Sequence, residues 1–176
     1  MTARRILVHL AGDRRGAAAI EFALIAPVMI TLLAGIMELS YFLMAERRVV
    51  ESSHAVADLI GQGTDLSAAE VDDILYAARQ IMTPFPDSAL KIGVASVTYD
   101  ATTGAPSLAW TANYNSGSVS NPTTKATGKG QAGESVIIVT SSYTYTPILK
   151  NILTANFTLS ETTYARPRTL SYVGKY

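Results

Sequence analysis

The sequence predicts an α+β fold with a long, partly transmembrane N-terminal helix, a second short helix, and an antiparallel sheet of about four strands. An apolar stretch near the N-terminus is long enough to cross a membrane. A helix-capping signal follows it, and the second half of the chain is rich in β-branched and aromatic residues. The length of 176 residues allows one modest domain beside the apolar stretch.

The apolar stretch runs from Phe22 to Ala45 and contains one acidic residue, Glu38. Its 24 residues would form about 36 Å of helix, which exceeds the thickness of about 30 Å of a bilayer core. The uncharged part before Glu38 is too short to span the bilayer alone. We therefore expect Glu38 either at the outer face of the membrane, with its carboxylate reaching water, or at an interface with a protein partner.

Four arginines precede the apolar stretch, at positions 4, 5, 14 and 15, and the longer, more polar part of the chain follows it. The positive-inside rule predicts a single-pass membrane protein with a cytoplasmic N-terminus and with the residues after about Arg47 outside. A conventional secretory signal is the competing interpretation. Such a signal places small residues after a shorter apolar core, whereas here the small residues 16–19 come before the apolar stretch.

Residues 14–42, RRGAAAIEFALIAPVMITLLAGIMELSYF, closely resemble the N-terminus of TadE-like proteins, the minor pilins or pseudopilins of tight-adherence (Flp-type) pilus systems. The family pattern is a basic leader, a glycine, four residues, a glutamate and usually an aromatic residue, here Gly16, Glu21 and Phe22. The resemblance implies that prepilin peptidase cuts between Gly16 and Ala17 and leaves the helix on the mature chain. It also implies that Glu21 and Phe22 act in recognition and assembly, with Glu21 neutralising the new N-terminal amine.

The resemblance also implies a domain organisation. Residues 1–16 form a basic prepilin-type leader, residues 17–63 the transmembrane and extended N-terminal helix, and residues 64–176 an exported α+β domain. The expected location is the bacterial inner membrane with a periplasmic C-terminal domain, or the cell exterior within a pilus. The alternative for Glu21 is a plain signal-anchor helix, in which an acidic residue near the start favours the helix dipole.

The exported domain is predicted to begin with a helix. Ser67 and Glu70 form a capping box, apolar residues follow at helical spacing as far as Met82, and Pro84 and Pro86 end the helix. Strands joined by non-helical segments come next, which favours an antiparallel sheet. They are predicted at residues 92–99, 108–114, 136–145 and 157–166.

Two connections in this domain are predicted without regular structure. Residues 115–133, rich in Ser, Thr, Gly, Asn and Lys, are expected to form a long exposed loop. Residues 148–153 are expected to form a short apolar turn between the last two strands. Those two strands, with a tyrosine-rich first member and the ending YARPR, resemble the closing hairpin of TadE-like domains.

The residue types that most catalytic chemistry needs are scarce. The absence of cysteine excludes thiol catalysis, disulfides and thiolate metal sites, and His54 is expected on the helix surface. The GKGQ sequence at 128–131 lacks the spacing of a phosphate loop, and Asp72 and Asp73 are expected on a solvated helix face. We therefore expect no enzyme activity, no cofactor and no metal site, and an anchored hydrolase that uses His54 is the alternative.

Three aromatic residues in the predicted strands have two interpretations. Trp110, Tyr143 and Tyr145 could form an adhesive or sugar-binding surface, but packing on a half-buried sheet is favoured.

The predicted function is a minor pilin-like component of a Flp or tight-adherence pilus that acts in pilus assembly or cell adhesion. The implied partners are prepilin peptidase, other pilin subunits, the pilus assembly machinery and membrane lipid. Nucleic acid is not expected, because the residues after position 16 hold ten basic and thirteen acidic groups. The alternative function is an uncleaved, signal-anchored surface-binding protein or adhesin.

Overall fold

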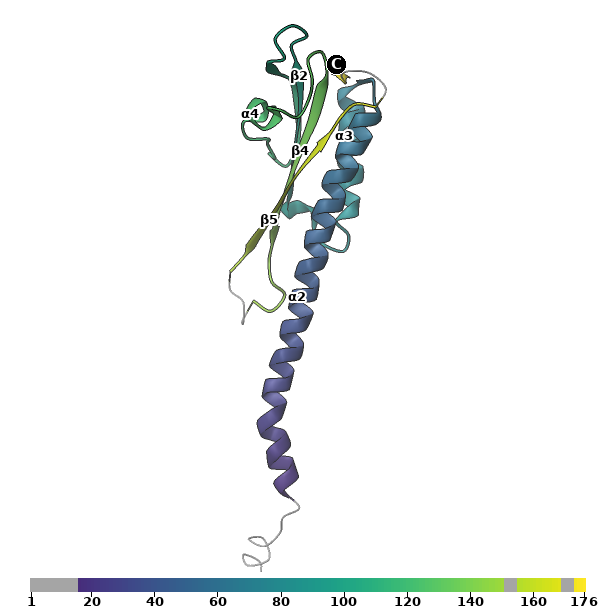
Figure 1. Cartoon of the computed structure of the whole chain (residues 1–176). Helices are drawn as coiled ribbons and strands as arrows, with labels where there is room; N and C mark the ends of the chain where they lie inside the picture. Colours follow the sequence, from purple (N-terminus) through teal and green to yellow (C-terminus); the bar gives the residue numbers. More distant parts are fainter. Residues whose placement is uncertain (1–15, 151–154, 169–172) are drawn as a thin grey trace, which may run out of the picture. The chain divides into compact units, whose positions relative to one another are not determined.

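The computed structural model describes residues 16–150, 155–168 and 173–176. The predicted leader before Gly16 and the second half of the predicted turn at 148–153 lie outside the described residues. The contacts divide the chain into two compact units, one up to Ser40 and one from Tyr41 to Tyr176. The elements are α2 (Ala17–Gln62), β1 (Asp65–Leu66), α3 (Ala68–Ile81), η2 (Asp87–Ala89), β2 (Leu90–Tyr99), β3 (Pro106–Tyr114), α4 (Pro122–Ala126), β4 (Ser135–Tyr145), β5 (Phe157–Ala165) and β6 (Gly174–Lys175) (Figure 1).

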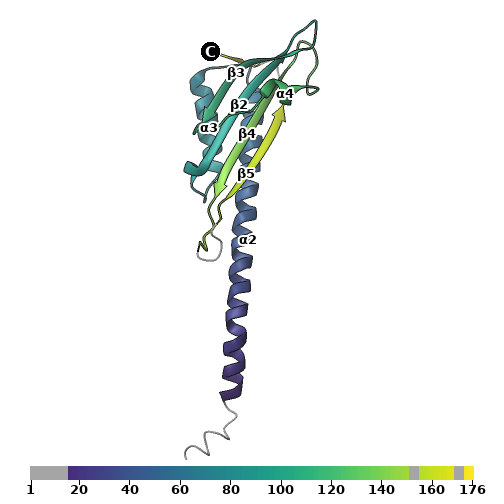
Figure 2. The same cartoon turned by 90° about the vertical axis from the view of Figure 1, so that its left-hand side faces the viewer.

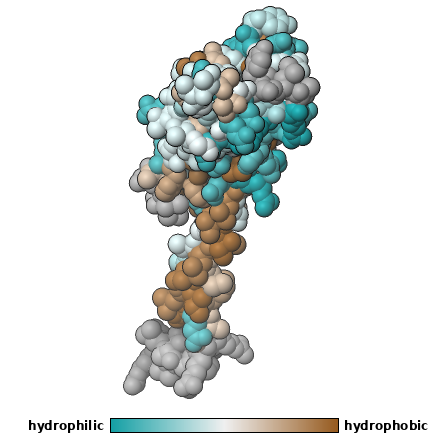
Figure 3. Space-filling model, turned by 45° about the horizontal axis from the view of Figure 1, so that its top comes forward, coloured by the Kyte–Doolittle hydropathy of each residue, from teal (hydrophilic) through white to brown (hydrophobic). Residues whose placement is uncertain are grey.

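The first unit is the N-terminal part of α2, which is long and apolar enough to cross a membrane. Its large apolar side chains are mostly exposed, and Figure 3 shows hydrophobic residues covering the visible face of this part of the helix. The helix continues through Pro27 although proline removes one backbone donor. Thr31 and Ser40 donate their hydroxyls to the carbonyls of Pro27 and Ile36, both at 2.8 Å, so both hydroxyls have acceptors within the helix.

The second unit is built on a four-stranded antiparallel sheet, as predicted, with the strand order β3-β2-β4-β5 (Figure 2). The central strands pair in a register that places Val94 opposite Val139, and β4 continues the ladder with Tyr143 opposite Leu159. The predicted closing hairpin is therefore confirmed as the antiparallel pair of β4 and β5. The observed strands agree with the predicted ones to within two residues at each end.

One face of the sheet packs against the second half of α2 and against α3. Alternate residues of a strand point to the same face, so β2 and β4 each contribute every second side chain to this core. Helix α3 has the predicted capping box: Glu70 N donates to Ser67 Oγ at 3.2 Å and Ser67 N donates to Glu70 Oε2 at 2.7 Å. The buried core side chains include Val49, Val56, Ile60, Val71, Leu75, Ile92, Val94, Ile137 and Val139.

The other face of the sheet is covered at one end by the segment that was predicted to be a long exposed loop. That prediction was incomplete, because residues 115–133 contain the short helix α4, whose Ala126 is buried against Val97 and Ile138. Tyr99 donates its hydroxyl to the Ala126 carbonyl, and burial raises the pKa of this tyrosine. A helix of five residues is too short to show a periodic pattern, and it also breaks the expectation that only non-helical segments join the strands.

A second, two-stranded sheet was also not predicted. Strand β6 near the C-terminus pairs in parallel with β1, and Leu66 lies opposite Lys175. Val173 is buried in the core, and its carbonyl accepts a hydrogen bond of 2.8 Å from the indole Nε1 of Trp110. Residues 173–176 therefore pack against β1 and Trp110 at one end of the domain.

The three aromatic residues with two interpretations belong to the core side of the sheet. Tyr143 and Tyr145 are buried, and Trp110 is half-buried with its indole nitrogen bonded. The favoured interpretation, packing, is thus confirmed for these side chains.

Candidate membrane-anchoring and assembly segment

Four of the five predicted site residues lie at the start of α2. Gly16 directly precedes the helix and Ala17 is its first residue. Gly16 is exposed, and a side chain added to it would meet no atom within 4 Å. The Gly16–Ala17 peptide bond therefore lies in open surroundings at the boundary between the helix and the residues before it.

Glu21 and Phe22 follow within the next helical turn. Glu21 lies four residues after Ala17, a separation that places two residues on the same face of a helix about one turn apart. Phe22 is 71% exposed, and Glu21 is the only charged residue between positions 16 and 37. Glu21 thus places a single carboxylate near the N-terminal end of an exposed apolar helix, about one turn after the first residue of that helix.

Glu38 differs from its neighbours on the helix. Its side chain is 5% exposed, whereas Met37 and Leu39 are both more than half exposed. The prediction that Glu38 forms an interface with a partner subunit stays a prediction.

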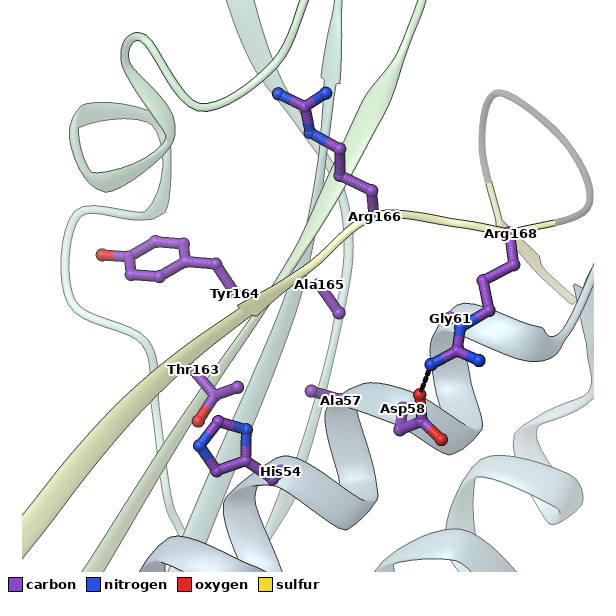
Figure 4. A pocket seen from close by; sticks show the side chains of 9 residues that line it. All are labelled: His54, Ala57, Asp58, Gly61, Thr163, Tyr164, Ala165, Arg166 and Arg168. Atoms are coloured by element: carbon purple, nitrogen blue, oxygen red, sulfur yellow. Dashed lines mark hydrogen bonds and ion pairs between the residues drawn. The ribbon is translucent and has the colours of Figure 1, made fainter.

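A pocket of about 300 Å³ lies between the end of α2 and strand β5 (Figure 4). Its lining combines one acidic, one imidazole, one phenol and two guanidinium side chains with small residues. The lining residues are His54, Ala57, Asp58, Gly61, Thr163, Tyr164, Ala165, Arg166 and Arg168.

Two charged side chains of this pocket pair with each other. Arg168 forms an ion pair with Asp58, and the same carboxylate accepts a hydrogen bond of 2.8 Å from Gln62 Nε2. The backbone nitrogen of Arg168 donates to the Gly61 carbonyl at 2.9 Å. Asp58 thus contacts a guanidinium and an amide at the end of α2.

The remaining polar contacts also join elements of the domain. Ser53 on α2 donates its hydroxyl to Thr163 Oγ1 on β5 at 3.0 Å, and Arg166 Nη2 donates to the Lys129 carbonyl at 2.8 Å. His54 is exposed on the helix, as predicted. Within the described ranges, no group of three or more His, Cys, Asp or Glu side chains could hold a metal ion. The pocket therefore functions in the structure as a junction between α2 and the end of the sheet.

Sequence reasoning did not find this junction. Arg168 and Asp58 are 110 positions apart, and neither lies in a local motif that would pair them. The only available signal was the arginine pair in YARPR, which supplies two of the pocket residues.

The fold and the exposed apolar helix define an α+β protein with one N-terminal helix that is compatible with a single-pass membrane anchor. Residues 16–58 match the model of the family described as TadE-like protein. This match confirms the predicted resemblance, and the chain therefore carries a TadE-like N-terminal segment, which indicates a component associated with a Tad pilus. Neither the comparison with curated proteins nor the comparison with solved structures gave a match.

Proposed function

We propose that this chain is a minor pilin-like (pseudopilin) component of a Flp or tight-adherence pilus that acts in pilus assembly or adhesion. The observation that carries the proposal is the TadE-like match, which begins at Gly16, one residue before the first residue of a long exposed apolar helix. The first part of α2 anchors the chain in the bacterial inner membrane, and the domain after it lies on the periplasmic side. The arginines before the helix support this orientation.

Prepilin peptidase is proposed to cut between Gly16 and Ala17. The exposed position of Gly16 supports this, because a residue without a side chain lets a protease approach the backbone closely. Since α2 begins at Ala17, cleavage there removes the basic leader and leaves the helix intact. A conventional signal peptidase would instead remove the anchor.

Glu21 is proposed to neutralise the amine that cleavage creates at Ala17, in its own chain or in a neighbouring subunit. The separation of four residues supports the intramolecular pair, because the two groups share one helix face. An unpaired carboxylate at the edge of an apolar helix is costly in lipid. Pairing within one chain lowers the cost of placing Glu21 at the edge of the lipid, and pairing with the amine of a neighbouring subunit favours packing of the N-terminal helices.

The proposed role is structural, so the partners are other pilin subunits, the assembly machinery, prepilin peptidase and membrane lipid. No catalytic residue or cofactor is assigned. The polar groups around His54 support this, because Asp58 and Thr163 are engaged in the junction between α2 and β5.

The function is tested by asking whether the chain is incorporated with other pilin subunits. Pili and membrane complexes are isolated from cells that carry the wild-type chain, Glu21→Gln or Glu46→Gln, and the amount of this chain in each fraction is compared. Glu46 is exposed on the same helix beyond the predicted span, so its variant is the matched control. The proposal expects the chain in the pilus fractions, a several-fold loss for Glu21→Gln, and none for Glu46→Gln. A chain that never accompanies other pilin subunits would favour the signal-anchored binding protein or adhesin.

A further inference from the structure

We propose that the end of the domain where β4 and β5 approach their connection is a second membrane contact, seated among the lipid headgroups on the periplasmic side. This end, the β4–β5 end, comprises Tyr145, Ile148, Lys150 and Phe157. The proposal rests on the proposed membrane anchoring. It adds that the folded domain itself touches the bilayer.

The depth of the β4–β5 end is set by contacts within the second unit. The ring of Phe42 on α2 packs edge-on against Tyr145, with centroids 5.5 Å apart, and against Phe157 at 5.7 Å. Phe42 lies three residues before Ala45, the last residue of the apolar stretch, which is about 4.5 Å along a helix axis. The headgroup layer on each side of a bilayer core is about 5–7 Å thick. The β4–β5 end therefore lies beside the last turn of the predicted span, at the level of the headgroups.

The side chains at this end suit an interfacial position. Ile148 is 60% exposed and Phe157 is 42% exposed. Exposed apolar residues that are scattered over a surface need no explanation, but these two lie on either side of one connection, and Phe157 packs against Phe42 of α2. Aromatic and aliphatic side chains at the boundary between headgroups and acyl chains stabilise interfacial segments.

The distribution of charge favours lipid over a second protein surface. Lys150 is the only charged residue between Glu134 and Glu161, and its side chain is exposed. A lysine can place its ammonium group among negatively charged lipid phosphates while its methylenes remain in apolar surroundings. Asp100 and Glu134 lie at the opposite end of the sheet, where Tyr99 N donates to the Glu134 carbonyl. On the β4–β5 side of the sheet, the carboxylate of Asp87 is paired with Arg79 at 2.8 Å, so that its charge is balanced within the domain.

The contact is tested in the full-length chain with single cysteines, because the sequence has no cysteine of its own. Ile148→Cys probes the β4–β5 end. Leu108→Cys is the matched control, since Leu108 is similarly exposed at 47% and pairs with Val97 toward the opposite end of the sheet. Leu43→Cys, in the last part of the predicted span, reports whether the helix itself is in lipid.

Each variant is labelled with an environment-sensitive fluorophore and reconstituted in vesicles of phosphatidylethanolamine and phosphatidylglycerol. Quenching is measured with nitroxide-labelled lipids and with aqueous iodide, after circular dichroism has shown that each labelled variant is folded. The proposal expects lipid quenching at position 148 to exceed that at position 108 by at least about twofold, with position 43 also quenched.

The other outcomes separate this inference from the proposed anchoring. Quenching by lipid at position 43 but equal, weak quenching at positions 148 and 108 would overturn the second contact and leave the anchor in place. Shielding of position 148 from both quenchers would assign the surface to a protein partner and would also overturn the proposal. Absence of lipid quenching at position 43 would overturn the anchoring, and this inference with it.

Discussion

Arg168 forms an ion pair with Asp58, and this contact joins the last turns of α2 to the segment that follows β5. The backbone nitrogen of Arg168 donates to the Gly61 carbonyl at 2.9 Å, so the main chain is held at the same point. The N-terminal part of α2 is proposed to lie in the membrane. The C-terminal end of α2 is bonded to the segment that follows β5, the edge strand of the sheet.

The ion pair itself is expected to contribute little stability. Both side chains are more than one third exposed, and water screens such pairs. A double-mutant cycle of Arg168→Ala and Asp58→Ala should give a coupling energy below about 1 kcal/mol in denaturant unfolding of the full chain in detergent. A coupling of several kcal/mol would show that the pair is less accessible to water than its exposure indicates.

The core between α2 and the sheet is expected to dominate stability. Ile137 on β4 is fully buried, so Ile137→Ala should lower the free energy of unfolding by about 2–5 kcal/mol, and Ile137→Val by about 0.5–1.5 kcal/mol. Leu108→Ala is the control and should change the free energy of unfolding by less than about 0.5 kcal/mol, because Leu108 is exposed. Fluorescence of Trp110, the only tryptophan, reports the unfolding. Equal losses for Ile137→Ala and Leu108→Ala would contradict the described core.

Because of the capping box of α3, the free energy of unfolding is expected to decrease as the pH is lowered into the acidic range. Hydrogen bonds from the Ser67 backbone and side chain to the Glu70 carboxylate lower the pKa of Glu70 below its usual value of 4.5. Because the pKa of Glu70 is lower in the folded state than in the unfolded state, its ionised carboxylate stabilises the fold at pH values above the unfolded pKa. This contribution is lost as the pH falls through the folded pKa. Denaturant unfolding between pH 6 and about pH 3 should therefore show an acid-dependent loss that is smaller in Glu70→Gln. An unchanged pH profile in Glu70→Gln would exclude this contribution.

The close approach of residues 115–118 to the sheet is expected to require Gly93. A side-chain carbon at Gly93 would lie 2.5 Å from the Ser118 carbonyl carbon, so the backbone would have to move. Gly93→Ala should destabilise the domain by about 1–3 kcal/mol, measured by denaturant unfolding. Lys91→Ala, on the same face of β2 but exposed, should be close to neutral. A neutral Gly93→Ala variant would show that the loop does not pack on the sheet in this way.

Local sequence signals predicted most of the fold. The capping box at Ser67 and Glu70 determines the start of α3 through contacts between residues three positions apart. The β-branched and aromatic run that became β4 was predicted to within one residue. Both signals depend only on near neighbours, and single-sequence reasoning can detect them.

The features that were missed depend on contacts between distant residues. Strand β6 has two residues, and its partner Leu66 precedes Lys175 by more than a hundred positions. Helix α4 is too short to be periodic, and the packing of Ala126 against the sheet stabilises it. The same contrast applies to the candidate site. Gly16 and Glu21 form a linear motif that could be predicted, whereas the junction of Asp58 and Arg168 exists only after folding.

The central claim is pilin-type processing, and the most direct measurement is the N-terminal residue and intact mass of the chain extracted from its native membrane. Gly16→Val is measured in parallel, with Gly35→Ala as the control, because Gly35 lies in the same helix and has open space around it. The account predicts a wild-type chain and a Gly35→Ala chain that begin at Ala17 with the helix retained, and a Gly16→Val chain that keeps its leader. A wild-type chain that still carries the residues before Gly16, or one that begins beyond Ala45, would contradict it.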